Sequence, residues 1–198
     1  MPMDPSEAQV DEVLAQRMRR GDDVAFAALA TRYWTALHRI GWNMLPDPSE
    51  AGELAEAALL SAWRSAGEFP PDVPFRTALY RQAMSQSLMR LQSVPSSATR
   101  SLGAFLPRFD ARGRLASGGT DWSGCGEGAF GQRDVAGRIR ETLQKLDPLD
   151  RAAFVLRDVE QLSVEESAAV LGITPAGIRH RTHRASLILT GAVSALAS

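Results

Sequence analysis

The densest group of side chains that could act on a ligand lies between positions 175 and 189. This stretch contains three arginines and two histidines and no acidic residue. An arginine guanidinium can donate two hydrogen bonds to guanine and can pair with phosphates. The two histidines could instead ligate a metal from one helical face, but the sequence offers no third ligand nearby. The pattern therefore favours nucleic-acid binding through Arg179, His180, Arg181, His183 and Arg184.

Start and stop signals around this stretch predict a helix-turn-helix. Ser163 and Glu166 have the spacing of a capping box, in which the hydroxyl and the carboxylate each accept a backbone N–H from the other residue. Gly172 suits the left-handed residue that ends a helix. Thr174 and Pro175 suit the cap and the first position of the next helix. We therefore expect two short helices joined by a three-residue turn over 162–185.

The second helix should turn one face inward and the other toward DNA. Ile178, Thr182, Ala185 and Leu189 follow helical spacing and are expected to face the core. The opposite face could enter a major groove, with the flanking arginines on phosphates. The alternative is a solvated helical hairpin in an all-helical protein. The residues expected to contact DNA are Thr174, Ala176, Arg179, His180, Arg181, His183 and Arg184.

The composition indicates a globular protein and excludes several other classes. The chain has 198 residues, of which 44% are hydrophobic. No apolar run approaches the roughly 20 residues of a membrane span, and the first residues do not resemble a signal peptide, so we expect a cytoplasmic protein without membrane contact. One cysteine, Cys125, excludes an intramolecular disulfide and a cysteine-rich zinc site. No glycine-rich phosphate loop follows a strand, so we expect neither an enzyme nor a cofactor.

The charge distribution bears on how DNA could be held. The net charge is −1, and the first 92 residues carry more acidic than basic side chains. Affinity for DNA that does not depend on sequence comes from neutralising phosphates. Because only the last helix is a cationic surface, tight DNA binding should need a partner.

Apolar periodicity predicts an all-α fold with two small helical domains joined by a flexible linker. The first domain covers 10–92 and the second covers 134–198. Between them, over 93–133, glycines recur, serines cluster and no period survives, which is typical of a flexible linker.

Local signals place the helices within these two domains. Asp22 or Asp23 should cap a helix that ends before Pro46, and Ser49 should begin another that runs to about Arg64. A further helix is expected over 75–91. In the second domain, Asp147 and Pro148 should open the helix that precedes the helix-turn-helix.

The order and spacing of several short motifs resemble the extracytoplasmic-function (ECF) sigma factors, the smallest class of bacterial transcription initiation subunit. The resemblance covers nearly the whole chain outside the linker. In the first domain it rests on GDDVAFAAL (21–29), AWR (62–64) and FRTALYR (75–81). In the second it rests on LQKL (143–146), FVLR (154–157), LSVEE (162–166) and RTHRA (181–185).

The resemblance implies a subunit that binds core RNA polymerase, recognises the minus-ten and minus-thirty-five promoter elements and directs transcription initiation. Its partners would be promoter DNA and the clamp helices and flap of the large polymerase subunits, and an anti-sigma factor is a further partner that the resemblance suggests. The residues implied in polymerase binding are Glu50, Glu53, Leu54 and Glu56. Those implied in capturing a flipped minus-ten base and opening the strands are Phe69, Asp72, Phe75, Arg76, Tyr80, Arg81 and Arg90.

The chain departs from the family pattern in the strand-opening helix. Ser85 and Met89 occupy positions where the family tends to have asparagine and aspartate, and Gln92 replaces part of a terminal basic pair. These changes leave open a sigma-like protein that binds polymerase and no longer melts promoters. A stand-alone helix-turn-helix regulator is the other alternative, and it would bind a two-fold site without polymerase.

Further departures lie in and before the helix-turn-helix. Ser167 and Thr182 replace bulky apolar residues of its core, and a buried hydroxyl without a partner costs on the order of 1 kcal/mol or more. Gln161 replaces a helix-ending glycine.

Overall fold

The computed structural model describes residues 5–67, 73–93 and 132–194. Of the linker expected over 93–133, these ranges include positions 93, 132 and 133 alone. Phe69 and Asp72 also lie outside the described ranges. Every regular element within the described ranges is helical, which confirms the all-α prediction. The first half contains α1 (Pro5–Arg19), α2 (Asp23–Met44), the short 3-10 turn η1 (Pro48–Glu50), α3 (Ala51–Arg64) and α4 (Phe75–Ser93). The second half contains α5 (Gln132–Lys145), α6 (Pro148–Phe154), a π-helical turn (Val155–Val159), α7 (Val164–Leu171) and α8 (Pro175–Ser194).

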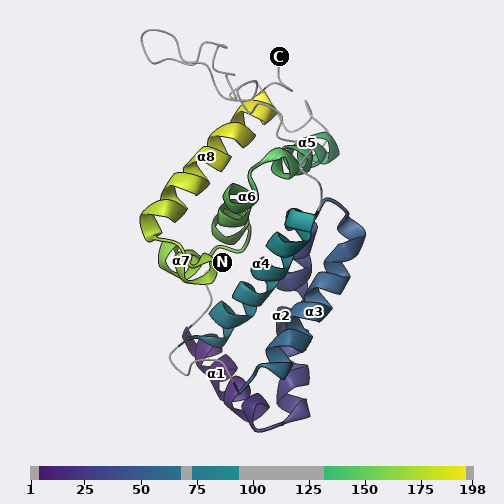
Figure 1. The fold of residues 1–198 in the computed structure, drawn as a ribbon, viewed down its shortest axis with the longest axis vertical. Helices are drawn as coiled ribbons and strands as arrows, with labels where there is room; N and C mark the ends of the chain where they lie inside the picture. Colours follow the sequence, from purple (N-terminus) through teal and green to yellow (C-terminus); the bar gives the residue numbers. More distant parts are fainter. Residues whose placement is uncertain (1–4, 68–72, 94–131, 195–198) are drawn as a thin grey trace.

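The two halves pack side by side, with α4 between them (Figure 1). On one side α4 packs against α2 and α3, and on the other it contacts α6 and α7. The start of the second half also reaches the first, because α5 contacts α2. None of the helices in the described ranges is both long and apolar enough to cross a membrane.

Helix α2 is the central element of the first half, and its start and its apolar face were both predictable. The Asp22 side chain accepts hydrogen bonds from the backbone N–H of Val24 at 3.0 Å and of Ala25 at 3.1 Å. These bonds satisfy donors that have no partner within the helix. The Asp22 pKa falls below its ordinary value because the Ala25 N–H and the Arg17 side chain stabilise the carboxylate. Apolar residues at helical spacing along α2 are buried at Leu29, Tyr33, Leu37, Ile40 and Met44, and Phe26 is half-buried.

The start of α3 differs from the sequence-based expectation. Ser49 was expected to begin this helix, but Asp47 caps a 3-10 turn first and α3 begins at Ala51. The side chain of Asp47 accepts from the Ser49 N–H at 2.8 Å. This tighter turn lets α3 approach α2 closely at Gly41, where an added Cβ would lie 2.8 Å from the Ala51 Cα. A side chain at position 41 would therefore force the two backbones apart.

The second half contains an irregular turn between α6 and α7. As predicted, Asp147 caps α6 and Pro148 occupies its first turn. The helix then widens into the π-helical turn, and Gln161 follows with a φ of +56°. It is the one residue other than glycine with a positive φ among the described positions. The family's usual glycine would adopt this conformation at little cost, whereas glutamine is strained there.

One hydrophobic core runs through both halves. Its buried members include Leu37, Met44 and Tyr80 from the first half and Leu156 and Leu162 from the second. A smaller cluster, formed by Leu143, Leu146, Ala185, Ile188 and Leu189, fixes α8 to α5. The two groups of helices thus pack as a single body across α4.

Candidate nucleic-acid interface

The helix-turn-helix forms from the signals that predicted it. The Ser163 hydroxyl accepts from the Glu166 N–H at 3.0 Å, and the Glu166 carboxylate accepts from the Ser163 N–H at 2.7 Å. Gly172 ends α7 with a φ of +66°, in the left-handed region. The Thr174 hydroxyl accepts from the Gly177 N–H at 3.1 Å at the start of α8. The capping box, the left-handed glycine and the threonine cap are therefore confirmed.

Helix α8 presents the expected outer face to solvent. Ile178, Ala185 and Leu189 are buried, as predicted for the inner face. The Arg179 side chain is 61% exposed and lies 3.8 Å from the Glu165 carboxylate, a distance that gives a weak surface ion pair. Exposed residues near it on the same helix are Ala176, His180, His183 and Arg184, with Thr174 exposed just before the helix.

The two arginines expected to flank this face have a structural partner that the sequence reading missed. Asp150 of α6 is buried, and its carboxylate lies 2.8 Å from Arg181 Nη1 and 3.1 Å from Arg184 Nε. Arg181 also lies 3.5 Å from the Asp147 carboxylate. The Arg184 contact is an ion pair without hydrogen-bond alignment, because Asp150 Oδ2 has no hydrogen-bond donor among the described residues. Asp150 therefore fixes the position of α8 on α6.

The polar substitutions in the helix-turn-helix core are not satisfied by protein partners. Ser167 is fully buried in α7, and Thr182 lies on the inner side of α8. Neither Ser167 Oγ nor Thr182 Oγ1 has a hydrogen-bond partner among the described residues. Both hydroxyls thus lose hydration on folding without compensation.

Replacing Ser167 with alanine is expected to raise the free energy of unfolding by about 1 kcal/mol, because the change removes an unpaired buried hydroxyl. Urea denaturation of the two proteins measures the difference. Ser163→Ala is the matched comparison, because this serine caps α7 and its loss should destabilise by about 1 kcal/mol. A loss of stability in Ser167→Ala would mean that an internal water bonds the hydroxyl.

The predicted minus-ten residues on α4 lie in two environments. Phe75 and Tyr80 are buried in the core, and the Phe75 N–H donates to Glu12 Oε1 at 2.6 Å. Arg76 is only 12% exposed, whereas Arg81 is exposed and donates to the Ala169 carbonyl of α7 at 2.7 Å. Arg90 lies 3.7 Å from Glu50, at the far end of α4.

A buried carboxylate from the second half, Glu160, meets these α4 residues. Arg39 of α2 donates to it through Nε at 2.6 Å and through Nη2 at 2.8 Å. The Tyr80 hydroxyl donates to Glu160 Oε2 at 3.3 Å. Burial, and secondly the charge of Glu160, raise the Tyr80 pKa to about 12. No sequence signal marked Arg39 or Glu160, which are 121 positions apart.

The environments of both tyrosines predict an unusual pH titration. Tyr33 and Tyr80 are the chain's two tyrosines, and burial followed by a hydrogen bond to Asp11 also raises the Tyr33 pKa. A phenol whose folded pKa exceeds its unfolded value of about 10 contributes stability below that pH and loses it as the pH rises through the folded pKa. In the native protein we expect no tyrosinate absorbance up to pH about 11, whereas the urea-unfolded chain should titrate near 10. Native titration near 10 by either tyrosine would contradict the burial of that side chain.

The residues predicted to bind polymerase lie at the end of η1 and in the first half of α3. Glu53 and Glu56 are exposed, Glu50 is half-buried, and Leu54 belongs to the core. Leu54 therefore supports this surface from beneath. The exposed stripe continues along α3 at helical spacing to Leu60 and Arg64.

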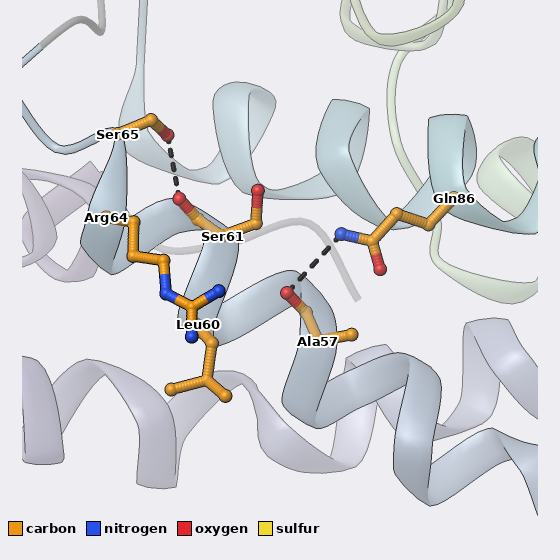
Figure 2. A pocket seen from close by; sticks show the side chains of 6 residues that line it. All are labelled: Ala57, Leu60, Ser61, Arg64, Ser65 and Gln86. Carbon is orange, nitrogen blue, oxygen red and sulfur yellow. Dashed lines mark hydrogen bonds between the residues drawn. The ribbon is translucent and has the colours of Figure 1, made fainter.

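A shallow groove of about 560 Å³ follows this stripe between α3 and α4. Figure 2 shows its lining, with Leu60 and Arg64 projecting from α3 and Gln86 reaching from α4. The Gln86 side chain donates to the Ala57 carbonyl at 3.3 Å, and Ser65 Oγ donates to the Ser61 carbonyl at 2.8 Å. The groove thus has an apolar centre between amide and hydroxyl groups, with a cation at one end.

Comparisons with known proteins match both the second half and the chain as a whole. Residues 136–189 match the family described as Sigma-70, region 4. The RNA polymerase sigma factor CnrH of Cupriavidus metallidurans is 28% identical over 198 residues, or 98% of each chain. The ECF RNA polymerase sigma-E factor of Escherichia coli K12 is 27% identical over 184 residues, or 91% of this chain and 92% of the relative.

Solved structures show the same fold. The structure of CnrH in complex with the cytosolic domain of CnrY has a TM-score of 0.67 and 24% identity, covering 93% of this chain and 97% of that one. The sigma factor RpoE in complex with the anti-sigma factor NepR, from Bartonella quintana, has a TM-score of 0.60 and 17% identity, covering 85% and 96%. The near full-length matches account for the first-half motifs as well as for the helix-turn-helix. A stand-alone regulator would explain the helix-turn-helix and leave the first-half motifs unexplained. Residues 136–189 thus match region 4 of the Sigma-70 family, and the chain is similar in sequence and fold, over nearly its full length, to RNA polymerase sigma factors, among them a sigma-E factor of the extracytoplasmic-function kind.

Proposed function

We propose that the chain reads a promoter through two surfaces and binds core RNA polymerase through a third. The observation that carries this proposal is the capped helix-turn-helix whose second helix exposes Arg179, His180 and His183 to solvent. This face of α8 lies in the major groove of the minus-thirty-five element. Ala176 contacts a base edge there, and Thr174 lies at the start of the helix. Arg181 and Arg184 reach phosphates from the edge of the same face.

The minus-ten element is assigned to α4 and the loop before it. Arg76, Arg81 and Arg90 neutralise the displaced strand, and Tyr80 and Phe75 support the helix that carries them. The assignments of Phe69 and Asp72 as base contacts rest on the family resemblance, because both lie outside the described residues. These contacts belong to a first domain over 10–92, which a linker over 93–133 joins to a second domain over 134–198.

Core polymerase is assigned to the outer face of α3. Glu53 and Glu56 supply exposed negative charge, Glu50 lies beside them, and Leu54 packs beneath. The polymerase clamp helices are the proposed partner of this face, and the flap is the proposed partner of the second half. A cytoplasmic location follows from this partner. The two solved relatives in complexes, with the cytosolic domain of CnrY and with NepR, favour control by an anti-sigma factor here as well.

The test is a two-step assay with purified chain and core polymerase. Complex formation is measured first, and run-off transcription from the organism's own promoters second. Failure to form any complex would reject the polymerase assignment.

A complex that gives no transcripts would favour the second candidate, a sigma-like protein without melting activity. A specific observation supports that candidate: the outer face of α4 exposes Ser85, Gln92 and Met89, the last at 58%, where the family has polar and basic groups.

Replacing Arg179 with alanine should weaken minus-thirty-five binding by the 1 to 3 kcal/mol typical of a bidentate base contact, roughly 5- to 150-fold. The loss of affinity should depend on one base pair of the element. Elements already substituted at that base pair should bind the variant and the parent nearly equally. Holoenzyme binding to a panel of single-base promoter variants measures it, with Arg138→Ala on α5, a half-buried arginine outside the assigned DNA surfaces, as the control. An equal loss on every sequence would assign Arg179 to phosphate.

A further inference from the structure

Helix α4, to which the proposed function assigns the minus-ten strand, obtains the acceptor for its first backbone N–H from another helix. Among the described residues just before it, Val73 and Pro74 carry no side-chain acceptor, and its first turn contains no acidic residue. The Phe75 N–H instead donates to Glu12 Oε1 of α1 at 2.6 Å, across 63 positions of the chain. A carboxylate suits this place, because the N-terminus of a helix carries partial positive charge and N–H donors without helical partners. Glu12 thus caps α4 from α1.

The neighbouring residue on α1 holds the same end of α4 by a second route. Asp11 is 1% exposed, accepts from the Tyr33 hydroxyl of α2 at 2.6 Å, and also pairs with Arg32. The Tyr33 ring meets the Phe75 ring edge-on, with 5.7 Å between the ring centres. Successive side chains point about 100° apart around a helix, so Asp11 can face α2 while Glu12 faces α4. The backbone and the side chain of Phe75 are therefore both fixed to one turn of α1.

Helix α1 contacts both α2 and α4 and contains none of the residues assigned to DNA or to polymerase. Its residues Ala15 and Met18 are buried in the core, and these apolar contacts do not involve position 12. Glu12 is half-buried, so its carboxylate loses part of its hydration on folding. A charge-assisted hydrogen bond to the helix N-terminus offsets that cost. The charge at Glu12 is therefore explained by its bond to Phe75, where the chain enters the minus-ten helix.

We propose that Glu12 is a positioning residue for minus-ten recognition, which fixes the first turn of α4 so that the displaced strand meets a preformed surface. The inference rests on the proposed function of α4, since Arg76 in this first turn is one of the cations assigned to that strand. A helix end without a cap frays, and ordering it during binding would weaken capture of the strand. With Glu12 in place the first turn is ordered before the DNA arrives.

Variants at position 12 test the proposal in holoenzyme made from the full chain and core polymerase. Glu12→Ala removes the acceptor, whereas Glu12→Gln removes the charge and keeps an oxygen that can accept the Phe75 N–H. Gln16→Ala is the matched control, because Gln16 is exposed one turn further along α1.

The probe is a fluorescent single-stranded oligonucleotide with the non-template minus-ten sequence of one of the organism's own promoters. Binding of core polymerase and of a minus-thirty-five duplex is measured alongside. Amide exchange at Phe75 in the free chain reports the hydrogen bond itself, and near-ultraviolet circular dichroism checks that each variant is folded.

We expect Glu12→Ala to accelerate exchange of the Phe75 amide and to weaken oligonucleotide binding about fivefold, the usual effect of losing a helix cap. Glu12→Gln should restore most of the affinity, and Gln16→Ala should bind like the parent. Core polymerase and the minus-thirty-five duplex should bind every variant as tightly as they bind the parent. Glu12→Asp serves if Glu12→Ala does not fold, because its shorter side chain withdraws the carboxylate from Phe75 and should give the same loss.

Three results would overturn the proposal. Unchanged oligonucleotide binding in Glu12→Ala, with or without faster exchange at Phe75, would show that the cap does not serve recognition. Equal losses on the oligonucleotide and on the minus-thirty-five duplex would indicate general destabilisation. A Glu12→Gln variant as weak as Glu12→Ala would show that the bond to the Phe75 N–H is not the cause.

The parent holoenzyme separates this failure from failure of the proposed function. If the parent binds the oligonucleotide and gives run-off transcripts while Glu12→Ala binds equally well, the role of Glu12 is rejected and the promoter assignment stands. If the parent neither binds the oligonucleotide nor transcribes, the promoter assignment itself fails.

Discussion

Replacing Arg151 with methionine should lower the free energy of unfolding by about 4 kcal/mol, since at least two charge-assisted hydrogen bonds of about 1.5 to 3 kcal/mol each are lost. Arg151 is buried, and its Nη1 donates to the Met44 carbonyl at 2.6 Å and to Gln144 Oε1 at 2.7 Å. Its Nη2 donates to the Gln144 carbonyl at 2.7 Å. Burial lowers the Arg151 pKa to about 10, so the guanidinium is still charged at neutral pH. Methionine fills much of the space and leaves these acceptors without a donor.

Urea denaturation monitored by circular dichroism measures this effect. Arg138→Met on α5 is the control, because its pair with Glu141 at 3.2 Å is on the surface and should contribute less than about 1 kcal/mol. If Arg151→Met changes stability no more than the control, water must satisfy the exposed carbonyls.

Replacing Asp150 with asparagine is expected to cost about 3 kcal/mol of stability, in the range for breaking a buried charge pair. The side chain of Asp150 is 1% exposed and forms ion pairs with both Arg181 and Arg184. An amide of the same shape keeps the packing and leaves two guanidinium groups beside a neutral acceptor. Helix α8 then loses the restraint that fixes its angle on α6.

The consequence for DNA should be separable from the loss of stability. At a temperature where Asp150→Asn is fully folded, we expect weaker binding of holoenzyme to the minus-thirty-five element, measured by competition with promoter duplexes. Glu141→Gln, which breaks two exposed pairs on α5, with Arg138 and with Lys145, should leave both stability and binding close to those of the parent. Unchanged DNA affinity in Asp150→Asn would show that α8 is positioned by its apolar face alone.

Local signals allowed the helix-turn-helix and the ends of most helices to be predicted. Capping depends on residues within three or four positions, so Ser163 with Glu166, Gly172 and Thr174 could be interpreted directly from the sequence. The exception was α3, where a proline after Asp47 favoured a 3-10 turn and delayed the helix to Ala51. Boundaries shift in this way when two nearby residues, here Asp47 and Ser49, can each cap a helix.

Contacts between distant positions could not be predicted. No local pattern marks Glu160, and only the approach of Arg39, 121 positions away, makes it a buried partner. Asp150 likewise carried no sequence signal, yet it is the buried partner of Arg181, 31 positions later, and of Arg184. Charge complementarity across such separations carries no periodic signal in a single sequence.

The candidate DNA-binding residues divide in the same way, into those predictable from local spacing and those that depend on packing between distant segments. Exposure of Arg179, His180 and His183 followed from helical spacing on one element. The positions of Arg76 and Arg81 against α7 depend on how the halves pack, which spacing within α4 does not encode. Phe75 and Tyr80 belong to the core because they are the large aromatic residues on the side of α4 that meets α2.

The C-terminal end of α2 has a consequence for how this chain folds. The last turn of α2 carries no basic residue, and carbonyls at and just beyond it accept hydrogen bonds from Arg140, Gln144 and Arg151, which are 94 to 107 positions later in the chain. Contacts across such separations require the closure of a long loop before they form. Helices α1 to α4 can therefore assemble from nearer contacts while this turn still frays. Its completion belongs to the latest step of folding, when the second half arrives.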